Sequence, residues 1–193
     1  MELSLGRYVG RMTAAGNLVL TGFMATGKST VGRLLADRLD LEFMDTDLII
    51  EERHGPIPEI FETQGEEAFR AMERSLAVEL GSRTGLVIAT GGGMLLDPNN
   101  VDALCRRGRI ICLVAGPEEI LRRVSADGSL AKRPLLAGDD PGGRIVELLA
   151  ERAPGYARFT HVATDGVEPD EVVEEVARMW REASGNRDAE ARM

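Results

Sequence analysis

Residues Gly22–Thr30 read GFMATGKST, a stretch in which glycine, lysine and serine stand at the GxxxxGK[ST] spacing of a phosphate-binding P-loop. An apolar run at 18–20 precedes the stretch and a helix-like segment follows it, which is the setting that the motif requires. Glycines let the backbone curl around a phosphate, so that N–H groups of the loop and of the helix N-terminus point at the anion. We therefore predict a phosphate site here, the alternative being a plain glycine-rich turn before a helix.

Two side chains of this loop carry its chemistry. Lys28 adds a point charge for the outer phosphates of a nucleotide, and the Ser29 hydroxyl can hold Mg²⁺. Lys28 is one of only two lysines in a chain that otherwise uses arginine as its cation. An arginine-rich proteome can produce that bias without functional pressure, yet the loop has retained its lysine.

Length and composition limit the class of protein. A chain of 193 residues suits one α/β domain, and its net charge of −9 argues against a nucleic-acid or anionic-membrane surface. No segment approaches the ~18 consecutive apolar residues of a membrane span. Cys105 and Cys112 lack the spacing of metal ligands, so we expect free thiols in a reducing cytosol. We expect a cytoplasmic monomer.

Apolar runs alternate with helical patterns along the chain, which is typical of a parallel sheet with crossover helices. The expected strands lie at 18–21, 41–44, 86–89, 110–114 and 161–163. The expected helices lie at 29–39, 46–53, 66–80, 99–106, 117–125, 144–152 and 168–182. We expect one domain at 17–183 with a mobile lid at about 127–143, a flexible extension at 1–16 in which Met12 is an alternative start, and a disordered tail at 184–193.

Two carboxylates stand at the tip of the second expected strand, where residues 43–47 read FMDTD. Parallel α/β sheets bind ligands at this carboxyl edge. Alternation along an extended chain sends Asp45 and Asp47 to the same side, so one can serve Mg²⁺ while the other meets a substrate hydroxyl. The alternative is that Thr46 or Asp47 merely caps the next helix.

Glycines and arginines farther along the chain suit a small anionic substrate. Residues 90–93 read TGGG, and three glycines permit positive φ and expose backbone N–H groups to a ligand. Arg70 could fork a substrate carboxylate, and Arg133 in the expected lid could close over the phosphates. The plain alternatives are a glycine-rich turn, a solvated helix charge for Arg70 and, for Arg152, a cation that satisfies a helix dipole.

Taken together, these motifs resemble the shikimate kinase family, from Asn17 to about Glu182. The resemblance is carried by GFMATGKSTVGRLLA, DTD, IFETQGEEAFR, ATGGG, KRPLL and ERAPGYARF. It implies a P-loop kinase fold like that of nucleoside monophosphate kinases, a three-layer α/β/α arrangement with a five-stranded parallel sheet in the order 2-3-1-4-5 and a mobile lid. It also implies ATP- and Mg²⁺-dependent phosphorylation of the shikimate 3-hydroxyl, a step towards chorismate and the aromatic amino acids.

The resemblance also implies a role for each matched residue. Those that would bind ATP are Ala25, Thr26, Gly27, Lys28, Ser29, Thr30, Arg123 stacked on adenine, and Arg133 from the lid. The Mg²⁺ ion would be held by Ser29 and, through water, by Asp45. Shikimate would be bound by Asp47, Arg70, Gly91, Gly92, Gly93 and Arg152. The catalytic residues would be Lys28, Arg133 and Asp47, the last as base or orienting group.

The chain also departs from the family pattern. Ala25 replaces a glycine that is usual in the middle of the P-loop, and we expect tuned affinity rather than loss. The stretch from Arg123 to Arg133 is a few residues longer than usual, and Gly155 stands where the family often has leucine. No residue of the stretch 164–168 corresponds clearly to the polar group that often faces adenine.

Other classes of P-loop protein fit less well. A GTPase switch needs an Asn-Lys-x-Asp motif, which neither lysine supplies, and a motor ATPase carries its strand-ending acids far downstream. A catalytically dead regulator would have no reason to keep Lys28, Asp47 and Arg133 together. Gluconate kinase is the nearest competitor among kinases, and the DTD, GGG and EAFR motifs favour shikimate.

Overall fold

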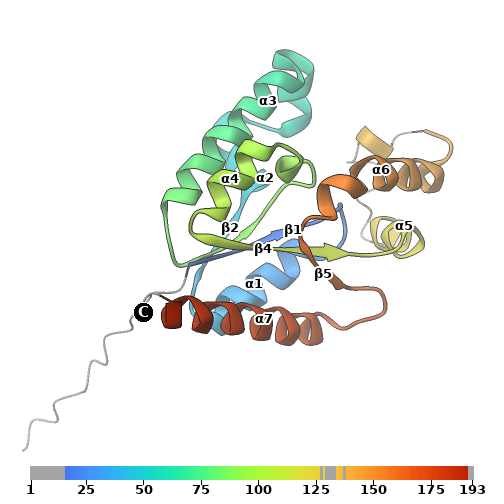
Figure 1. Ribbon diagram of the computed structural model, residues 1–193. Helices are drawn as coiled ribbons and strands as arrows, with labels where there is room; N and C mark the ends of the chain where they lie inside the picture. The colour runs from blue at the N-terminus through green and yellow to red at the C-terminus, as the bar shows by residue number, and fades with distance from the viewer. Residues whose placement is uncertain (1–15, 127, 129–133, 137, 191–193) are drawn as a thin grey trace, which may run out of the picture.

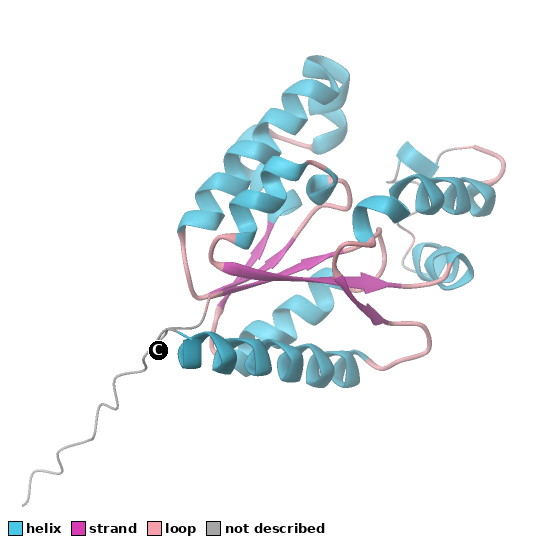
Figure 2. Ribbon diagram, viewed as in Figure 1, coloured by secondary structure: helices cyan, strands magenta, loops and turns pink. Residues whose placement is uncertain are grey.

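The structure is a computed structural model that describes residues 16–126, 128, 134–136 and 138–190 of the chain. Its five strands pair in parallel in the order β2-β3-β1-β4-β5, which confirms the order that the family resemblance implies (Figures 1 and 2). All five expected strands form, as β1 (Asn17–Thr21), β2 (Glu42–Asp45), β3 (Leu86–Ala89), β4 (Gly108–Val114) and β5 (Thr160–Ala163).

Helices cover both faces of this sheet (Figure 1). One face carries α1 (Lys28–Leu39) and α7 (Pro169–Glu190), and the other carries α2 (Thr46–His54), α3 (Ile57–Ser82) and α4 (Pro98–Cys105). Beyond the carboxyl end of β4 lie α5 (Pro117–Ala126) and α6 (Pro141–Tyr156). Two short 3₁₀ turns complete the described elements, η1 (Met94–Leu96) and η3 (Pro134–Leu136).

The central strand β1 shows why the sheet is covered on both sides. Leu18 and Leu20 enter an apolar cluster with α1 and α7, while Val19 enters another with α3 and α4. All three side chains are fully buried, as expected for a strand between two helical layers. A third cluster joins Phe23, just past β1, to α5 and α6. The P-loop therefore starts from a rigid base.

Three helices extend well beyond their expected ranges, and one of them, α6, exceeds 144–152 by three residues at its start and four at its end. A helical segment that starts at Ile57 precedes Gly65, whose φ of 82° and ψ of 171° interrupt α3. Only the segment after Gly65 has the apolar periodicity that predicts a helix at 66–80, and the earlier segment is anchored chiefly by the buried Ile60. On the other side of the sheet, α7 continues to Glu190, past 182 and into the segment for which a disordered tail is predicted.

Candidate active site

The P-loop connects β1 to α1 in a backbone conformation that requires glycine at two of its positions. Gly22 has φ 133°, and a Cβ placed there would lie 2.1 Å from the Leu113 carbonyl oxygen. Gly27 has φ 94° and precedes the first turn of α1. Within the loop, the buried Thr26 hydroxyl donates to the Phe23 carbonyl at 2.9 Å. The loop backbone is therefore fixed from inside, with the α1 N-terminus aimed across it.

Lys28 and Ser29 lie where a nucleotide with its metal ion would need them. The Lys28 ammonium donates to the Phe23 carbonyl at 2.7 Å and so lies across the loop. The Ser29 hydroxyl donates to Asp45 Oδ2 at 2.7 Å. A hydroxyl paired with one carboxylate fits Mg²⁺, which prefers oxygen ligands and keeps several waters. The described residues contain no group of three or more His, Cys, Asp or Glu that could hold a metal.

Asp45 also begins α2. Its Oδ1 accepts from the backbone N–H groups of Asp47, at 3.1 Å, and Leu48, at 3.4 Å, so Asp45 is the N-cap. The alternative that Thr46 or Asp47 caps this helix is wrong, because the extended backbone at Asp45 brings its own side chain over the first turn. Capping holds one oxygen of Asp45 in place and leaves the other directed at Ser29.

Asp47 has an unusual environment for a carboxylate. Burial, and next the neighbouring Asp45, raise the pKa of Asp47 from 3.8 to about 6, against the attraction of Lys28. The side chain lies against the glycine stretch, since a Cβ on Gly91 would come 2.4 Å from Asp47 Oδ1. A carboxylate with a pKa near neutrality beside a phosphate loop is suited to orienting a hydroxyl and accepting its proton.

The triple glycine is required for space rather than for backbone angle. None of Gly91, Gly92 and Gly93 has positive φ, so the expectation that this conformation explains them is wrong. Instead, a Cβ on Gly92 would lie 3.2 Å from an Arg152 guanidinium nitrogen, and one on Gly93 would lie 3.0 Å from Arg70. Side chains at these positions would displace both arginines. The structure thus brings together Asp47, Arg70, Arg152 and the three glycines.

Arg70 is oriented by two acidic residues of its own helix. Its Nη1 donates to Glu73 Oε2 at 2.7 Å, and its Nη2 donates to Glu66 at 2.9 Å. Glu73 is only 1% exposed, and burial raises its pKa although the Arg70 hydrogen bond opposes this. Sequence reasoning missed Glu73. The signal for it was an acidic residue on the apolar stripe of α3, between Phe69 and Leu76, which are both buried.

Two residues for which the sequence predicted no role in the site tie the glycine stretch to the helices around it. The Gly91 N–H donates to the buried Thr46 hydroxyl at 2.9 Å, which joins the stretch to α2. The Tyr156 hydroxyl donates to the Gly92 carbonyl at 2.6 Å, which joins it to α6. Burial raises the pKa of Tyr156 to about 12, so the phenol remains a donor. On the same helix, the Arg152 guanidinium lies over the Phe23 ring, 5.3 Å from its centroid.

A cavity of about 330 Å³ joins the two halves of the site. Its lining includes Ala25, Lys28 and Ser29 from the P-loop, Asp45 and Asp47 from the end of β2, and Gly92. The cavity opens at the carboxyl edge of the sheet, where α/β folds bind ligands. A phosphate donor and a small acceptor can therefore meet in one space.

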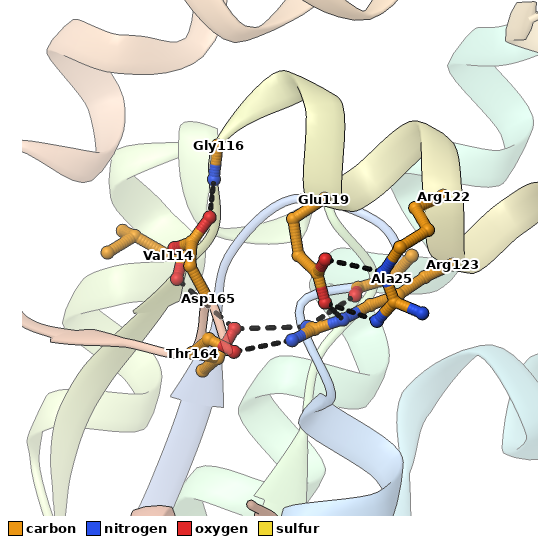
Figure 3. Close-up of polar contacts among 8 residues, drawn as sticks. All are labelled: Ala25, Val114, Gly116, Glu119, Arg122, Arg123, Thr164 and Asp165. Carbon is orange, nitrogen blue, oxygen red and sulfur yellow. Dashed lines mark hydrogen bonds and ion pairs between the residues drawn. The ribbon is translucent and has the colours of Figure 1, made fainter. Parts of the chain in front are cut away.

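The two remaining predicted residues are placed differently. Arg123 on α5 does not line this cavity; its guanidinium contacts protein oxygens of Ala25, Glu119 and Thr164 (Figure 3). Arg133 and part of the predicted lid at 127–143, namely 127, 129–133 and 137, lie outside the described residues. Of the described helices, none is long and apolar enough to cross a membrane.

Comparisons with known proteins show which family this chain resembles. The family model described as "Shikimate kinase" matches residues 24–181. A shikimate kinase of Caldanaerobacter subterraneus subsp. tengcongensis is 46% identical over 172 residues, which cover 88% of this chain and 98% of that protein. One from Thermus thermophilus is 47% identical over 169 residues, covering 86% and 91%. The solved shikimate kinase from Acinetobacter baumannii in complex with shikimate has a TM-score of 0.78 at 36% identity, covering 86% of this chain and 93% of that one.

Proposed function

Because this chain belongs to the shikimate kinase family, we propose that it transfers the γ-phosphoryl group of ATP to the 3-hydroxyl of shikimate. The products are shikimate 3-phosphate and ADP, on the route to chorismate and the aromatic amino acids. The observation that best supports this proposal is one cavity, lined by Lys28 and Ser29 together with Asp47 and Gly92. It offers a nucleotide half and an acceptor half within one cavity.

The nucleotide half is built from the P-loop. Backbone N–H groups of residues 25–30 cradle the phosphates, and the Lys28 ammonium turns from the Phe23 carbonyl to the outer phosphates when they bind. Ser29 and, through water, Asp45 would hold Mg²⁺, which supplies charge neutralisation for the transferring group. Arg133, from the expected lid, would add a further cation for the phosphates.

The acceptor half matches the groups of shikimate, which has one carboxylate and three hydroxyls. Arg70 and Arg152 approach the same glycine stretch, and together they supply a forked cationic site for the carboxylate. Asp47 accepts a hydrogen bond from the reacting hydroxyl and takes its proton as the phosphoryl group arrives. With a pKa of about 6, Asp47 is mostly ionised at pH 7 yet close enough to neutrality to hold a proton briefly.

Selectivity follows from the polarity of this half. An analogue without one of the hydroxyls leaves a polar group of the site unpaired, which costs far more than a lost apolar contact. Gluconate also has a carboxylate and hydroxyls, but its open chain does not hold them in a fixed ring geometry. Gluconate kinase activity is therefore the second candidate to be tested.

A coupled assay of ADP release with shikimate, gluconate and nucleoside monophosphates tests the proposal. We expect turnover with shikimate alone. Turnover with gluconate and none with shikimate would overturn the assignment. Asp47→Asn should remove most activity while ATP affinity stays nearly unchanged, and an equal loss of ATP affinity would place Asp47 on the nucleotide side instead.

We also propose that the protein acts as a cytoplasmic monomer. Among the described residues, neither Cys105 nor Cys112 forms a disulfide, which suits a reducing compartment. Each half of the site is complete within one chain, so catalysis does not need a second copy. Sedimentation equilibrium at micromolar concentration checks the oligomeric state, and a mass of one chain is expected.

A further inference from the structure

The P-loop contains a backbone conformation that its sequence disfavours. Ala25 has φ 59°, in the left-handed region, where a Cβ crowds the following carbonyl. Among the described residues, Asp40 is the only other non-glycine residue with positive φ, and it ends α1, where this conformation is common. Ala25 lies in the loop before α1 and not at the end of a helix, so this explanation does not apply to it. The contacts inside the loop, from Thr26 and Lys28 to the Phe23 carbonyl, do not involve Ala25, so its restraint has to come from elsewhere.

Arg123 on α5 supplies that restraint. Its Nη1 donates to the Ala25 carbonyl oxygen at 3.1 Å, across 98 residues of sequence (Figure 3). The same nitrogen donates to the Thr164 hydroxyl at 3.0 Å, and Nη2 donates to the Thr164 carbonyl. The guanidinium therefore bridges the P-loop and the end of β5, and its in-plane donors are directed at protein oxygens.

Arg123 is itself held in place from two sides. Glu119, one turn earlier on α5, accepts from its Nε at 2.7 Å. Thr164 is buried, and its N–H and hydroxyl both donate to the Val114 carbonyl, at 2.9 and 3.2 Å. Next to it, Asp165 accepts from the Gly116 N–H at 2.6 Å (Figure 3). The ends of β4 and β5 thus form a fixed frame for the guanidinium.

We propose that Arg123 is a positioning residue for the P-loop, holding Ala25 in its left-handed conformation so that the loop N–H groups are pre-organised for phosphate. This inference rests on the proposed role of the P-loop as the ATP site. It differs from adenine stacking, in which Arg123 would recognise the base and leave the phosphate cradle unaffected. The loop restraint instead acts on every polyphosphate, with or without a base.

Inorganic tripolyphosphate separates the two roles, because it has the phosphates of ATP and no adenine. We measure the affinities of ATP and tripolyphosphate by titration calorimetry, with Mg²⁺ present, for the unmodified protein and for Arg123→Gln. The loss of charge-assisted hydrogen bonds should weaken both ligands by about tenfold. The KM for shikimate should change by less than about twofold, since Arg123 does not line the cavity. Loss of ATP affinity with unchanged tripolyphosphate affinity would overturn the inference in favour of stacking.

Arg122→Gln is the matched control. Arg122 precedes Arg123 on α5 and pairs with the same Glu119, but it is largely exposed and its hydrogen bonds reach no P-loop atom. We expect unchanged affinity for both ligands. Thr164→Val is a second variant that keeps the shape of the frame, removes one partner of Arg123 and should weaken both ligands by about two- to threefold. An unchanged thermal midpoint for each variant shows that the fold is intact.

Ala25→Gly tests the link to backbone conformation. Glycine adopts positive φ readily, so the loop should then depend less on Arg123. In the Ala25→Gly background, Arg123→Gln should weaken tripolyphosphate binding by about threefold rather than tenfold, a coupling of the two sites. Equal losses in both backgrounds would contradict the inference. If the unmodified protein binds neither ATP nor tripolyphosphate, the proposed function fails instead, and the two failures are distinguishable.

Discussion

Replacing Asp47 with asparagine should make the protein more stable while it loses activity. Folding raises the pKa of Asp47 from 3.8 to about 6. This rise in pKa corresponds to about 3 kcal/mol, at about 1.36 kcal/mol for each pH unit. Because the Asp47 side chain is only partly buried, solvent screening reduces the cost to about 1–2 kcal/mol. Above pH 6 the ionised Asp47 thus destabilises the folded state by that amount. Asparagine cannot ionise, so the variant lacks this cost.

The sign of the pH dependence follows from the same shift. Between about pH 4 and 6 the unfolded chain has released the Asp47 proton and the folded chain retains it, so stability falls as pH rises. The gain in folding stability from Asp47→Asn should reach its full size above pH 6 and vanish below pH 4. For a domain of this size, 1–2 kcal/mol raises the midpoint of thermal unfolding by about 2–8 °C.

Thermal unfolding of both proteins from pH 4 to pH 8 measures this difference. Asp102→Asn, which removes an exposed carboxylate from α4, is the control and should leave the midpoint unchanged at every pH. In parallel, kcat/KM for shikimate should rise with pH through about 6 in the unmodified protein. An Asp47→Asn variant that is less stable at pH 8, or equally stabilised at pH 4 and pH 8, would refute the reasoning.

Three further changes test other parts of the site. Glu73→Gln removes the buried charge that orients Arg70; we expect the KM for shikimate to rise about tenfold with the KM for ATP unchanged, measured by steady-state kinetics. A matching rise in both KM values would show a general loss of structure. Tyr156→Phe removes the 2.6 Å hydrogen bond to Gly92 and should cost about 1 kcal/mol in urea unfolding and raise the KM for shikimate a few-fold, whereas no change in either would contradict its tethering role. Chelation of Mg²⁺ should abolish turnover without lowering the thermal midpoint of the free protein, because the oxygens of the proposed metal site already bond to each other.

Much of the fold was predictable because its signals are local. Each strand is a short apolar run, and most of the helices follow a periodic pattern with a cap or a proline at its start. The first part of α3 was missed because Gly65 interrupts the pattern, so the periodic window begins only after it. The triple glycine was found, but positive φ was the wrong reason for it, and the crowding by Arg70 and Arg152 from distant helices carried no local signal.

Some parts of the site were missed because the residues that meet there are far apart in the sequence. Tyr156 and Gly92 are 64 residues apart, and Thr46 and Gly91 are 45 apart, so no pattern along the chain links either pair. Glu73 carried a signal, an acid on an apolar helix stripe three residues after Arg70, and this local spacing was overlooked. The Tyr156 and Thr46 contacts form only once the folded chain brings α6 and α2 against the glycine stretch.

The sequence by itself determined the phosphate loop, since GxxxxGK[ST] specifies a backbone shape and its two reactive side chains within one local segment. It also determined the presence of Asp45, Asp47 and the arginines. Only the tertiary structure decided how they cooperate. Parallel pairing places the β2 carboxylates beside the loop, and burial there raises the Asp47 pKa. The Ala25 conformation likewise depends on Arg123 from α5, because a left-handed alanine needs a partner that only the folded chain provides.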